Sequence, residues 1–469
     1  MKLVAVVKRE CPTCSLIAPV LKQLDATDGI ELTVFTQDDP TFPSGVTNVS
    51  FDDDLAFSYH HEIETVPTLI ADDGERIVGW SRDAWEKFTG VDGLGPGLPD
   101  HRPGCGSLSV DPGLVDELRA RFESHRLKAR RVDLADLEDE MEALFDRGWT
   151  DGLPVVPPTE RRVLRMLEGT TRAADEIVAT VPPDLVECTV EKVAINAVLA
   201  GCAPEYLPVV LAALEAACTD EFNMHGLLAT TMPVGPVLII NGPIRRRIGM
   251  NAGVNVLGQG NRANATIGRA LQLVIRNVGG GRPGGVDRAT QGNPGKVSFC
   301  FPEDEEGSPW EPLHVERGFA PQASTVTLFP GEGPRGVVDQ LSRDPESLAR
   351  SLAACLRTVQ HPKLPMVFDA ILVISPEHGR VFREAGWSKA QVKERLHELT
   401  LLEGADIVRG AGGITEGVPD WLKDSQLPKF RPEGIVMVHA GGGAGLFSTI
   451  IGGWANGETG SQPVTREIR

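Results

Sequence analysis

The sequence contains no apolar run of 18 or more residues, the length at which a membrane-spanning helix is suspected. Its most apolar stretch, residues 193–218, is interrupted by prolines and by polar or charged residues: Asn196, Pro204, Glu205, Pro208 and Glu215. The first ten residues also lack the apolar core of a signal peptide and favour a buried strand instead. We therefore expect a soluble, cytoplasmic protein that has no membrane partner.

Basic residues and cysteines are both in short supply. Asp and Glu number 65 against 46 Lys and Arg, which gives a formal net charge of −19. This excess of negative charge repels phosphate backbones, so we expect no nucleic-acid partner. Eight cysteines in 469 residues are too few for a disulfide scaffold. Hydrophobic residues at 41% and charged residues at 24% are ordinary for a globular chain and exclude disorder.

Aromatic residues are few, with 16 Phe, 7 Trp and 2 Tyr, whereas glycine (51) and proline (35) are abundant. Glycine at this frequency, without low-complexity repeats, indicates many tight turns and close backbone approaches, as in ligand-binding loops. At roughly 150 residues per domain, the length predicts about three domains, or a small domain followed by a large one.

Residues 1–92 alternate strand and helix signals around two cysteines. An apolar strand at 3–8 leads into Cys11-Pro12-Thr13-Cys14, and apolar residues at helical spacing follow as far as Gly29. Further elements are expected at 31–35 (strand), 53–60 (helix), 66–70 (strand), 76–80 (strand) and from Ser81 (helix).

The spacing of Cys11 and Cys14 carries a chemical prediction. A cysteine at the first turn of a helix has its thiolate stabilised by free backbone N–H groups and by the helix dipole. Cys11 is therefore predicted to be the attacking thiol and Cys14 the resolving one. A zinc knuckle is an alternative, but its second ligand pair would have to be His60 and His61, which are typical of a polar helix end. A structural remnant without redox activity is the third interpretation.

The order of elements in residues 1–92 resembles that of the thioredoxin-like family. The resemblance implies an α/β fold with a redox-active disulfide between Cys11 and Cys14 as its only cofactor. It further implies that Pro67 is a cis-proline that faces the pair and contacts the substrate, and that Val66 offers its backbone to an extended substrate. Glu10 stands where the family usually has Trp.

Residues 93–112 are rich in Gly and Pro and are expected to form a flexible linker. Cys105 lies in this linker between two glycines, where burial in an apolar core is a poor explanation. We interpret Cys105 as a mobile thiol that carries electrons between the CxxC pair and a distant site; an incidental exposed cysteine is the alternative. Residues 113–147, Leu137 among them, show an amphipathic pattern that predicts a helical brace.

Residues 148–469 are expected to form a large α/β domain that carries the catalytic chemistry. Continuous apolar strands followed by polar loops favour a buried, mostly parallel sheet, and they lie at 236–240, 370–374 and 435–438. Loops after the carboxyl ends of such strands line a ligand crevice. A candidate anion nest follows the last strand, at Gly441, Gly442 and Gly443, with a simple tight turn as the alternative.

This second region resembles a bacterial family of largely uncharacterised proteins associated with UGSC-type selenoproteins, which carry a Sec/Cys-Gly-Ser-Cys motif. The residues that carry the resemblance are Gly148–Thr159, Thr189–Ala197 with Gly201-Cys202, Asn223–Gly226, Asn251–Arg282, Ser308–His314 and the Gly-rich C-terminal loop. The resemblance implies a UGSC-type (seleno)protein partner and a substrate with a bond to sulfur, selenium or another soft atom.

The densest polar cluster of the chain lies within residues 251–288. Arginine presents a fixed fork and asparagine both donates and accepts hydrogen bonds, so this combination suits a carboxylate, an amide or a phosphate. The predicted substrate-binding residues are Asn251, Asn255, Asn261, Arg262, Asn264 and Arg269, together with His314. The alternative is that these side chains cap helices and tie down loops.

Two further residues are candidates for catalysis. His225, in Asn-Met-His-Gly, is a candidate general acid or base, although a lone histidine is more often structural. Cys202 ends an apolar helix beside Gly and Pro and is a candidate reactive thiol, with a buried core cysteine as the alternative. No HExxH motif and no close His/Asp/Glu pair at metal-binding spacing occurs, so no metal site is predicted, and a metal assembled from distant residues stays open as the alternative.

These observations predict a thiol-dependent oxidoreductase in which the CxxC head supplies electrons to small-molecule chemistry in the large domain. The chemistry includes reductive cleavage of a bond to a soft atom, and an external thiol is the reductant. Two alternatives stay open. One is a non-redox lyase or hydrolase whose reactive cysteine is kept reduced by the head, and the other is a thiol-regulated binding subunit. Each is compatible with a homo-oligomer.

Overall fold

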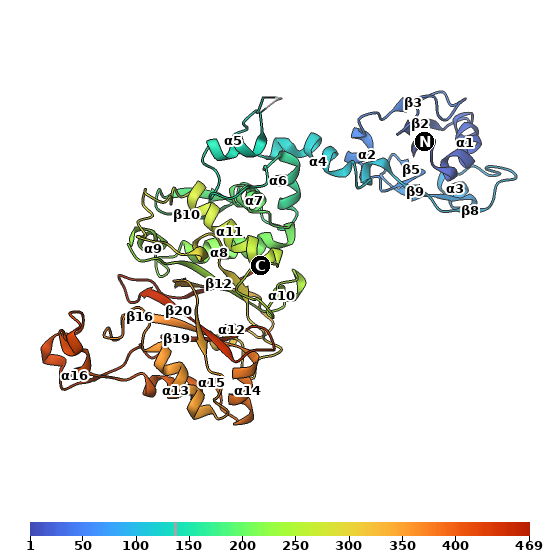
Figure 1. Ribbon diagram of the computed structural model, residues 1–469. Helices are drawn as coiled ribbons and strands as arrows, with labels where there is room; N and C mark the ends of the chain where they lie inside the picture. The colour runs from blue at the N-terminus through green and yellow to red at the C-terminus, as the bar shows by residue number, and fades with distance from the viewer. Residues whose placement is uncertain (136–137) are drawn as a thin grey trace. The chain divides into compact units, whose positions relative to one another are not determined.

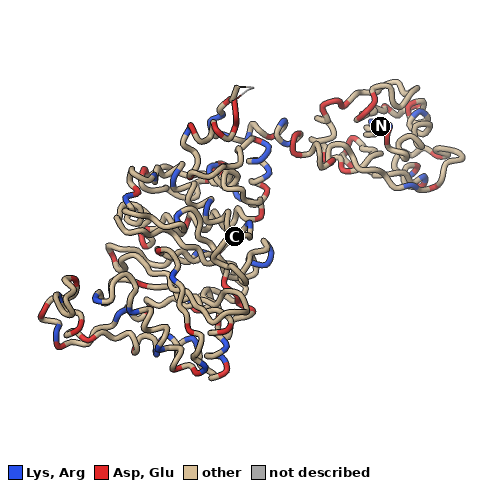
Figure 2. The backbone as a smooth tube through the Cα atoms, in the orientation of Figure 1, with Lys and Arg blue, Asp and Glu red and all other residues tan. Residues whose placement is uncertain are grey.

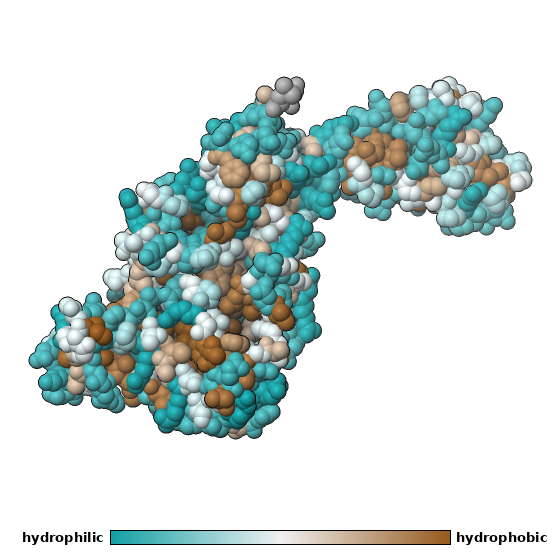
Figure 3. All heavy atoms as spheres, in the orientation of Figure 1, coloured by the Kyte–Doolittle hydropathy of each residue, from teal (hydrophilic) through white to brown (hydrophobic). Residues whose placement is uncertain are grey.

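A computed structural model describes residues 1–135 and 138–469, and the chain divides into two compact units, 1–127 and 128–469 (Figure 1). Both units combine helices with strands, so the expected α/β class is confirmed. No helix within these described ranges is long and apolar enough to cross a lipid bilayer. Figure 3 shows mainly hydrophilic atoms on the visible surface, with smaller apolar patches between them.

The first unit is built on a five-stranded sheet in the order β3-β2-β1-β5-β6. Strands β1, β2 and β3 are parallel to one another, whereas β5 runs antiparallel to both β1 and β6. The strands of this unit are β1 (Lys2–Val7), β2 (Glu31–Thr36), β3 (Val49–Phe51), β4 (Thr65–Val66), β5 (Thr68–Ala71), β6 (Arg76–Val78), β7 (Trp80–Ser81), β8 (His101–Arg102) and β9 (Cys105–Gly106). The helices are α1 (Pro12–Asp25), α2 (Ala56–His60), α3 (Arg82–Thr89) and α4 (Val115–Glu123).

Helix α1 begins where the sequence predicts. Cys11 is its N-cap with an extended backbone, and Pro12 occupies the first helical position, where its missing N–H costs nothing. The apolar residues of α1 recur at helical spacing and pack into the core of the unit. Trp80 and Trp85 extend this core, with ring centroids 5.4 Å apart.

Residues 93–112 differ from the expected flexible linker, because they fold onto the first unit. Strand β8 pairs with β7, and β9 pairs with β4. The Arg82 guanidinium donates hydrogen bonds to backbone carbonyls of this segment, those of Leu94, Gly95 and Leu98. The sequence predicted a flexible linker because this segment has few apolar residues. The hydrogen-bond donors and strand partners that stabilise it lie in other parts of the sequence.

The expected brace at 113–147 is two separate helices, α4 in the first unit and α5 (Glu140–Asp146) in the second. The boundary between the units falls between Leu127 and Lys128, inside that range. Leu137, which contributed to the amphipathic pattern, lies outside the described residues.

The second unit contains an eight-stranded sheet along the path β13-β12-β14-β20-β16-β19, with β15 paired to β20 and β21 paired to β14. The strands of this sheet are β12 (Gly235–Asn241), β13 (Cys300–Pro302), β14 (Thr325–Gly331), β15 (Arg335–Val338), β16 (Phe368–Ile374), β19 (Ile435–His439), β20 (Phe447–Ala455) and β21 (Val464–Glu467). Smaller two-stranded sheets are formed by β10 (Ile177–Val181) with β11 (Val186–Thr189) and by β17 (Leu402–Glu403) with β18 (Gln426–Leu427).

The prediction of a mostly parallel sheet is wrong. Only β12–β13 and β16–β19 pair in parallel, and the remaining pairs of this sheet, β12–β14, β14–β20, β14–β21, β15–β20 and β16–β20, are antiparallel. Every residue of β12, β14 and β16 is buried, which means that both faces of the sheet are covered. A continuous apolar run reports this two-sided burial and contains no information about strand direction.

Helices cover one face of strands β16 and β19. Alternate residues of β16, such as Leu372, pack against α13, α14 and α15, while Ile371 and Val373 face a second apolar cluster that includes Val256. Helix α8 packs on β14 and β21, and α7 packs on α11. The helices are α6 (Glu160–Leu167), α7 (Val190–Ala200), α8 (Leu207–Ala217), α9 (Met224–Ala229), α10 (Ile244–Arg247), α11 (Arg262–Asn277), α12 (Leu313–Glu316), α13 (Pro345–Leu356), α14 (Pro376–Glu384), α15 (Lys389–Leu399) and α16 (Gly404–Ile407).

Charged residues of both signs are distributed along the helices and loops of the second unit (Figure 2). Asp369, at the start of β16, is a buried exception that forms a bidentate ion pair with Arg431. The Asp369 carboxylate is buried, and pairing with the partly exposed Arg431 guanidinium compensates for its lost hydration.

Removing the Arg82 guanidinium should free residues 93–100. Because Arg82→Ala deletes hydrogen bonds to three carbonyls of the segment, we expect a broad-specificity protease to cleave there about tenfold faster than in the wild type. Limited proteolysis followed by peptide mapping gives the rate. Arg76→Ala is the matched control, since Arg76 donates to the His61 carbonyl elsewhere on this unit. Equal cleavage of wild type and Arg82→Ala would contradict an Arg82-held segment.

Candidate functional site

Three cysteines of the first unit meet at the amino end of α1, and we call Cys11, Cys14 and Cys105 the cysteine cluster. Cys11 is the N-cap of α1, and Cys14 lies in the first helical turn. Strand β9 brings Cys105 opposite Val66 of β4 in antiparallel register. The Sγ atoms of Cys11 and Cys105 are 2.7 Å apart, and all three cysteines are free thiols.

The segment that carries Cys105 is held by specific contacts, and we call residues 103–107 the Cys105 segment. The Thr13 hydroxyl donates to the Pro103 carbonyl over 2.7 Å, and the Lys8 ammonium donates to the Gly106 carbonyl over 2.7 Å. Gly104 approaches β4 so closely that an added Cβ would lie 2.4 Å from Thr65 Cγ2. Only glycine fits at this position, so the approach of Cys105 to Cys11 depends on it.

Hydrogen bonds to Cys11 favour its thiolate. The thiol of Cys14 donates to Cys11 and, against the opposing effect of burial, lowers the pKa of Cys11 from 9.0 to about 5; the thiol of Cys105 adds to the effect. The Cys14 backbone N–H also donates to Cys11 Sγ over 3.3 Å. Burial, and next the hydrogen bond to Cys11, raise the pKa of Cys14 far above its ordinary value, and the same causes raise the pKa of Cys105. The cluster therefore holds one thiolate between two neutral thiols.

Solvent reaches the three sulfur-bearing residues unequally. Cys11 and Cys14 are each 0% exposed, whereas Cys105 is partly exposed and packs on the core of the unit. The Val66 backbone, which the thioredoxin-like resemblance assigns to an extended substrate, is paired with Cys105 itself. Pro67 follows in a cis peptide and is buried, and its contact with a substrate stays a prediction.

Sequence reasoning found Cys11, Cys14 and Cys105 but missed the residues that bring them together. Thr13 and Lys8 act on carbonyls of the Cys105 segment, and neither interaction leaves a pattern in the sequence. The one usable signal was Gly104, because a glycine directly before an isolated cysteine indicates a close backbone approach.

The zinc alternative finds no support in the geometry. The Nδ1 atom of His61 lies 3.0 Å from the Phe57 carbonyl, and the His61 ring stacks on the Phe57 ring. Across residues 1–135 and 138–469, no group of three or more His, Cys, Asp or Glu side chains is arranged to hold a metal ion.

In the second unit, most of the predicted substrate-binding residues already have structural partners. The Asn264 side chain accepts from the Asn251 N–H and donates to the Asn251 carbonyl, and Asn261 caps α11 by accepting from the Asn264 N–H. Arg262 donates to the carbonyls of Gly201 and Cys202. Arg269 forms a bidentate ion pair with Asp151 at 2.7 and 2.8 Å. These contacts favour the capping and loop-tethering alternative over substrate binding.

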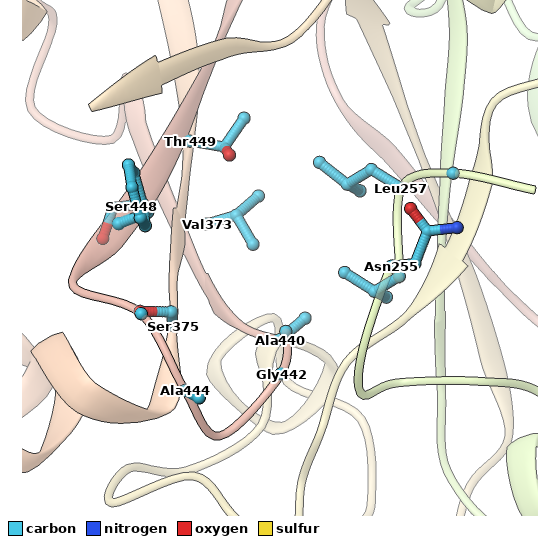
Figure 4. A pocket seen from close by; sticks show the side chains of 14 residues that line it. Asn255, Leu257, Val373, Ser375, Ala440, Gly442, Ala444, Ser448 and Thr449 are labelled. Atoms are coloured by element: carbon cyan, nitrogen blue, oxygen red, sulfur yellow. The ribbon is translucent and has the colours of Figure 1, made fainter. Parts of the chain in front are cut away.

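Asn255 also has a structural partner, since its amide donates to the Gln259 carbonyl over 2.7 Å, but it differs from the others in lining a cavity of about 420 Å³ in the second unit. In Figure 4, Val373 and Thr449 face Leu257 and Asn255 across this cavity. The predicted anion-binding glycines contribute Gly441 and Gly442 to the lining, but Gly443 is not part of it.

The chemistry of this cavity does not favour an anion. No charged residue lines it, and the Gly441 N–H is already bonded to the Ala252 carbonyl. The Gly445 N–H donates to the Glu377 carboxylate, so a negative charge of the protein already lies at this loop. A neutral ligand suits the cavity better than the predicted anion.

Ser448 also borders the cavity and was missed from the sequence. Its hydroxyl lies 2.8 Å from His378 Nδ1, and His378 Nε2 lies 3.1 Å from the Asp339 carbonyl. Because a carbonyl cannot donate, Nε2 carries the proton in a neutral ring, and Nδ1 accepts from Ser448. The hydroxyl is turned away from the cavity in Figure 4, which is consistent with a structural hydrogen bond.

The remaining candidates of the second unit are not brought together in one site. His225 is exposed on α9. His314 is fully buried, with Nε2 3.3 Å from the Pro321 carbonyl. Burial raises the pKa of Cys202 to about 12, so this thiol stays protonated at neutral pH. That environment favours the buried-core interpretation of Cys202 over the reactive one.

The titration of Cys11 tests the hydrogen bonds of the cluster. In reduced wild type, ultraviolet absorbance should report thiolate formation near pH 5. Cys14→Ala removes the strongest stabilising donor, so the transition should move to higher pH, and Cys11→Ser should abolish it. Cys188→Ala is the control, because burial raises the pKa of Cys188 to about 12, outside this range. An unshifted transition in Cys14→Ala would show that Cys14 does not stabilise the thiolate.

Replacement of Arg269 tests its structural role. Arg269→Met leaves the mostly buried Asp151 carboxylate unpaired, so we expect the second unit to lose about 2–3 kcal/mol of unfolding free energy. The double variant Asp151→Leu with Arg269→Met should lose less, because no unpaired charge remains. Denaturant unfolding followed by circular dichroism measures both. A single variant as stable as the wild type would instead favour a ligand-binding role.

Comparisons of the chain with protein-family models, with curated proteins and with solved structures gave no match. Similarity therefore assigns neither a family nor an activity. The function has to be inferred from geometry, and the cysteine cluster is the arrangement whose chemistry is most specific.

Proposed function

We propose that the protein is a thiol-dependent oxidoreductase whose first unit is a thioredoxin-like module with Cys11 as its attacking thiolate. The single observation that carries this proposal is the convergence of three free thiols at the amino end of α1, where the Cys14 backbone N–H donates to Cys11 Sγ and Cys105 Sγ lies 2.7 Å from it. The thiolate is the nucleophile in thiol–disulfide exchange, and a lowered pKa makes it available at neutral pH.

The arrangement of the first unit supports the thioredoxin-like interpretation. A CxxC pair follows the central strand β1 and opens α1, and the sheet combines parallel β1–β2 with antiparallel β5 and β6. The loop at Val66 and Pro67 lies beside the pair, with the Val66 carbonyl 3.5 Å from Cys11 Sγ. These features match the order of elements on which the resemblance rests.

The exchange reaction balances as follows. One thiolate of the cysteine cluster attacks one sulfur of a substrate disulfide, forming a mixed disulfide and releasing the other sulfur as a thiolate. A second thiol of the cysteine cluster loses its proton to solvent and attacks, which releases the remaining substrate sulfur. The cluster is then oxidised to one disulfide, and two electrons from an external thiol reductant restore it.

The second unit would hold the small-molecule chemistry, and its neutral cavity beside Asn255 is the best site for a substrate. Its buried cysteines at 188 and 202 and its half-buried Cys218 are protonated at neutral pH, since burial raises the pKa of each to about 12. This favours placing the redox chemistry in the first unit. A UGSC-type (seleno)protein partner and cleavage of a bond to a soft atom rest on the family resemblance.

Disulfide reduction tests the proposal directly. With dithiothreitol as electron donor and glutathione disulfide as substrate, the reduced protein should release glutathione faster than dithiothreitol alone. Cys11→Ser should return the rate to that of dithiothreitol, because the cluster then lacks the thiol whose pKa is lowered. The measurement is glutathione released per unit time, assayed enzymatically.

Cys188→Ser is the matched control and should behave as the wild type, because Cys188 is a buried core residue. Wild-type rates in Cys11→Ser would sink the proposal. In that case turnover of other compounds by a Cys11→Ser, Cys14→Ser double variant would point to a lyase or hydrolase, and binding without turnover to a thiol-regulated subunit.

A further inference from the structure

Cys11, whose thiolate the cluster favours, is not the cysteine that solvent reaches. Cys11 is 0% exposed, as is Cys14, and the Cys105 sulfur lies 2.7 Å from Cys11 Sγ. Cys105 is the only partly exposed member of the cluster. A substrate sulfur that approaches the cluster therefore meets Cys105 first.

We propose that Cys105 is the exchange thiol of the site: substrates and reductants become covalently attached to Cys105, and Cys11 reacts only with Cys105. This inference rests on the proposed function and names the cysteine that reacts first with the substrate. It also defines the substrate class as small disulfides and thiols, because the backbone of Val66 is already paired with β9 and offers no edge to an extended peptide.

The chemistry of the oxidised cluster follows from this arrangement. In a Cys11–Cys105 disulfide, an incoming thiolate attacks Cys105 Sγ, the accessible sulfur, and the disulfide bond breaks. Its electron pair leaves on Cys11 Sγ, and the incoming sulfur forms a mixed disulfide with Cys105. A second thiolate then attacks the incoming sulfur and releases the Cys105 thiolate, which takes a proton from solvent. Two external thiols are thereby oxidised to one disulfide, and the protein disulfide is reduced.

The leaving group explains why attack at Cys105 is favoured. Exchange is faster when the departing thiolate is more stable, and Cys11 is the sulfur that the Cys14 N–H and thiol stabilise. Attack at Cys11 would instead expel Cys105, whose thiolate is disfavoured by burial. Cys14 then acts as a positioning residue that donates to Cys11 and need not form a disulfide.

The Cys105 segment is built for short-range exchange. Disulfide sulfurs are separated by about 2.05 Å, so the Cys11 and Cys105 sulfurs need to approach by less than ~1 Å. Thr13, Lys8 and Gly104 hold the segment at this distance, and the Ser107 N–H donates to the Glu64 carbonyl over 2.9 Å. No rearrangement of the strands is required for the bond to form.

The test uses reduced full-length protein and 2,2′-dithiodipyridine, a small disulfide that releases a coloured thione at each exchange. In wild type, Cys105 passes its proton to the Cys11 thiolate and attacks the probe, which releases one thione. Cys11 then loses this proton to solvent and attacks Cys105 Sγ, which forms the Cys11–Cys105 disulfide and releases a second thione. Cys11→Ser should release only one in this phase and keep a stable pyridyl adduct on Cys105. Cys105→Ser should lose the fast phase, because Cys11 stays covered. Peptide mass spectrometry assigns every adduct and separates the cysteines of the second unit.

A second variant tests the covering of Cys11 without replacing any cysteine. Thr13→Val removes the hydroxyl that donates to Pro103, so Cys11 should become more accessible and be alkylated by iodoacetamide faster than in the wild type. Thr47→Val is the matched control, because the Thr47 hydroxyl bonds to Asp25 elsewhere on the unit.

The outcomes distinguish this inference from the proposed function. A fast adduct on Cys11 in Cys105→Ser, resolved by Cys14 with release of a second thione, would overturn the role of Cys105 and leave the oxidoreductase intact. If none of the three cysteines forms a disulfide or adduct in the wild type, the proposed function fails together with it. A Cys11–Cys105 disulfide in both wild type and Cys14→Ala supports the inference.

Discussion

The contact between Cys11 and Cys105 depends on backbone pairing rather than on the cysteines themselves. Strand β9 is only two residues long, yet its pairing with β4 places one sulfur over another across 94 residues of sequence. The exchange role proposed for Cys105 follows from that contact. Without it, Cys11 would be an ordinary N-cap cysteine exposed at a helix terminus, and Cys105 an isolated thiol between glycines.

The local elements of the first unit were predictable because each is encoded by neighbouring residues. An apolar run indicated β1, and apolar residues at helical spacing after the CxxC motif indicated α1. The sequence did not predict that residues 93–112 have a defined structure, because Arg82 and β4 supply the stabilising hydrogen bonds from outside this segment. Sequence patterns report what a segment can bury and not what a distant residue donates to it.

The same limit explains the second unit. Apolar strands were located correctly at 236–240, 370–374 and 435–438, but their direction depends on the connections between them. The polar residues near α11 suggested a binding surface because Arg and Asn recognise substrates and backbone carbonyls with the same groups. Arg262 and Arg269 illustrate the ambiguity, since the guanidinium groups of both donate hydrogen bonds to other residues of the protein. Composition alone could not separate these uses.

Gly104 gives the first unit an all-or-none property. Since a single added carbon at this position would meet Thr65 and the Val66 carbonyl, no series of progressively larger side chains can adjust how tightly the Cys105 segment lies against β4. Natural variation at residue 104 would therefore separate chains into two discrete kinds, those with a covered Cys11 and those with an open one. The reactivity of Cys11 therefore depends on the absence of a Cβ atom at residue 104.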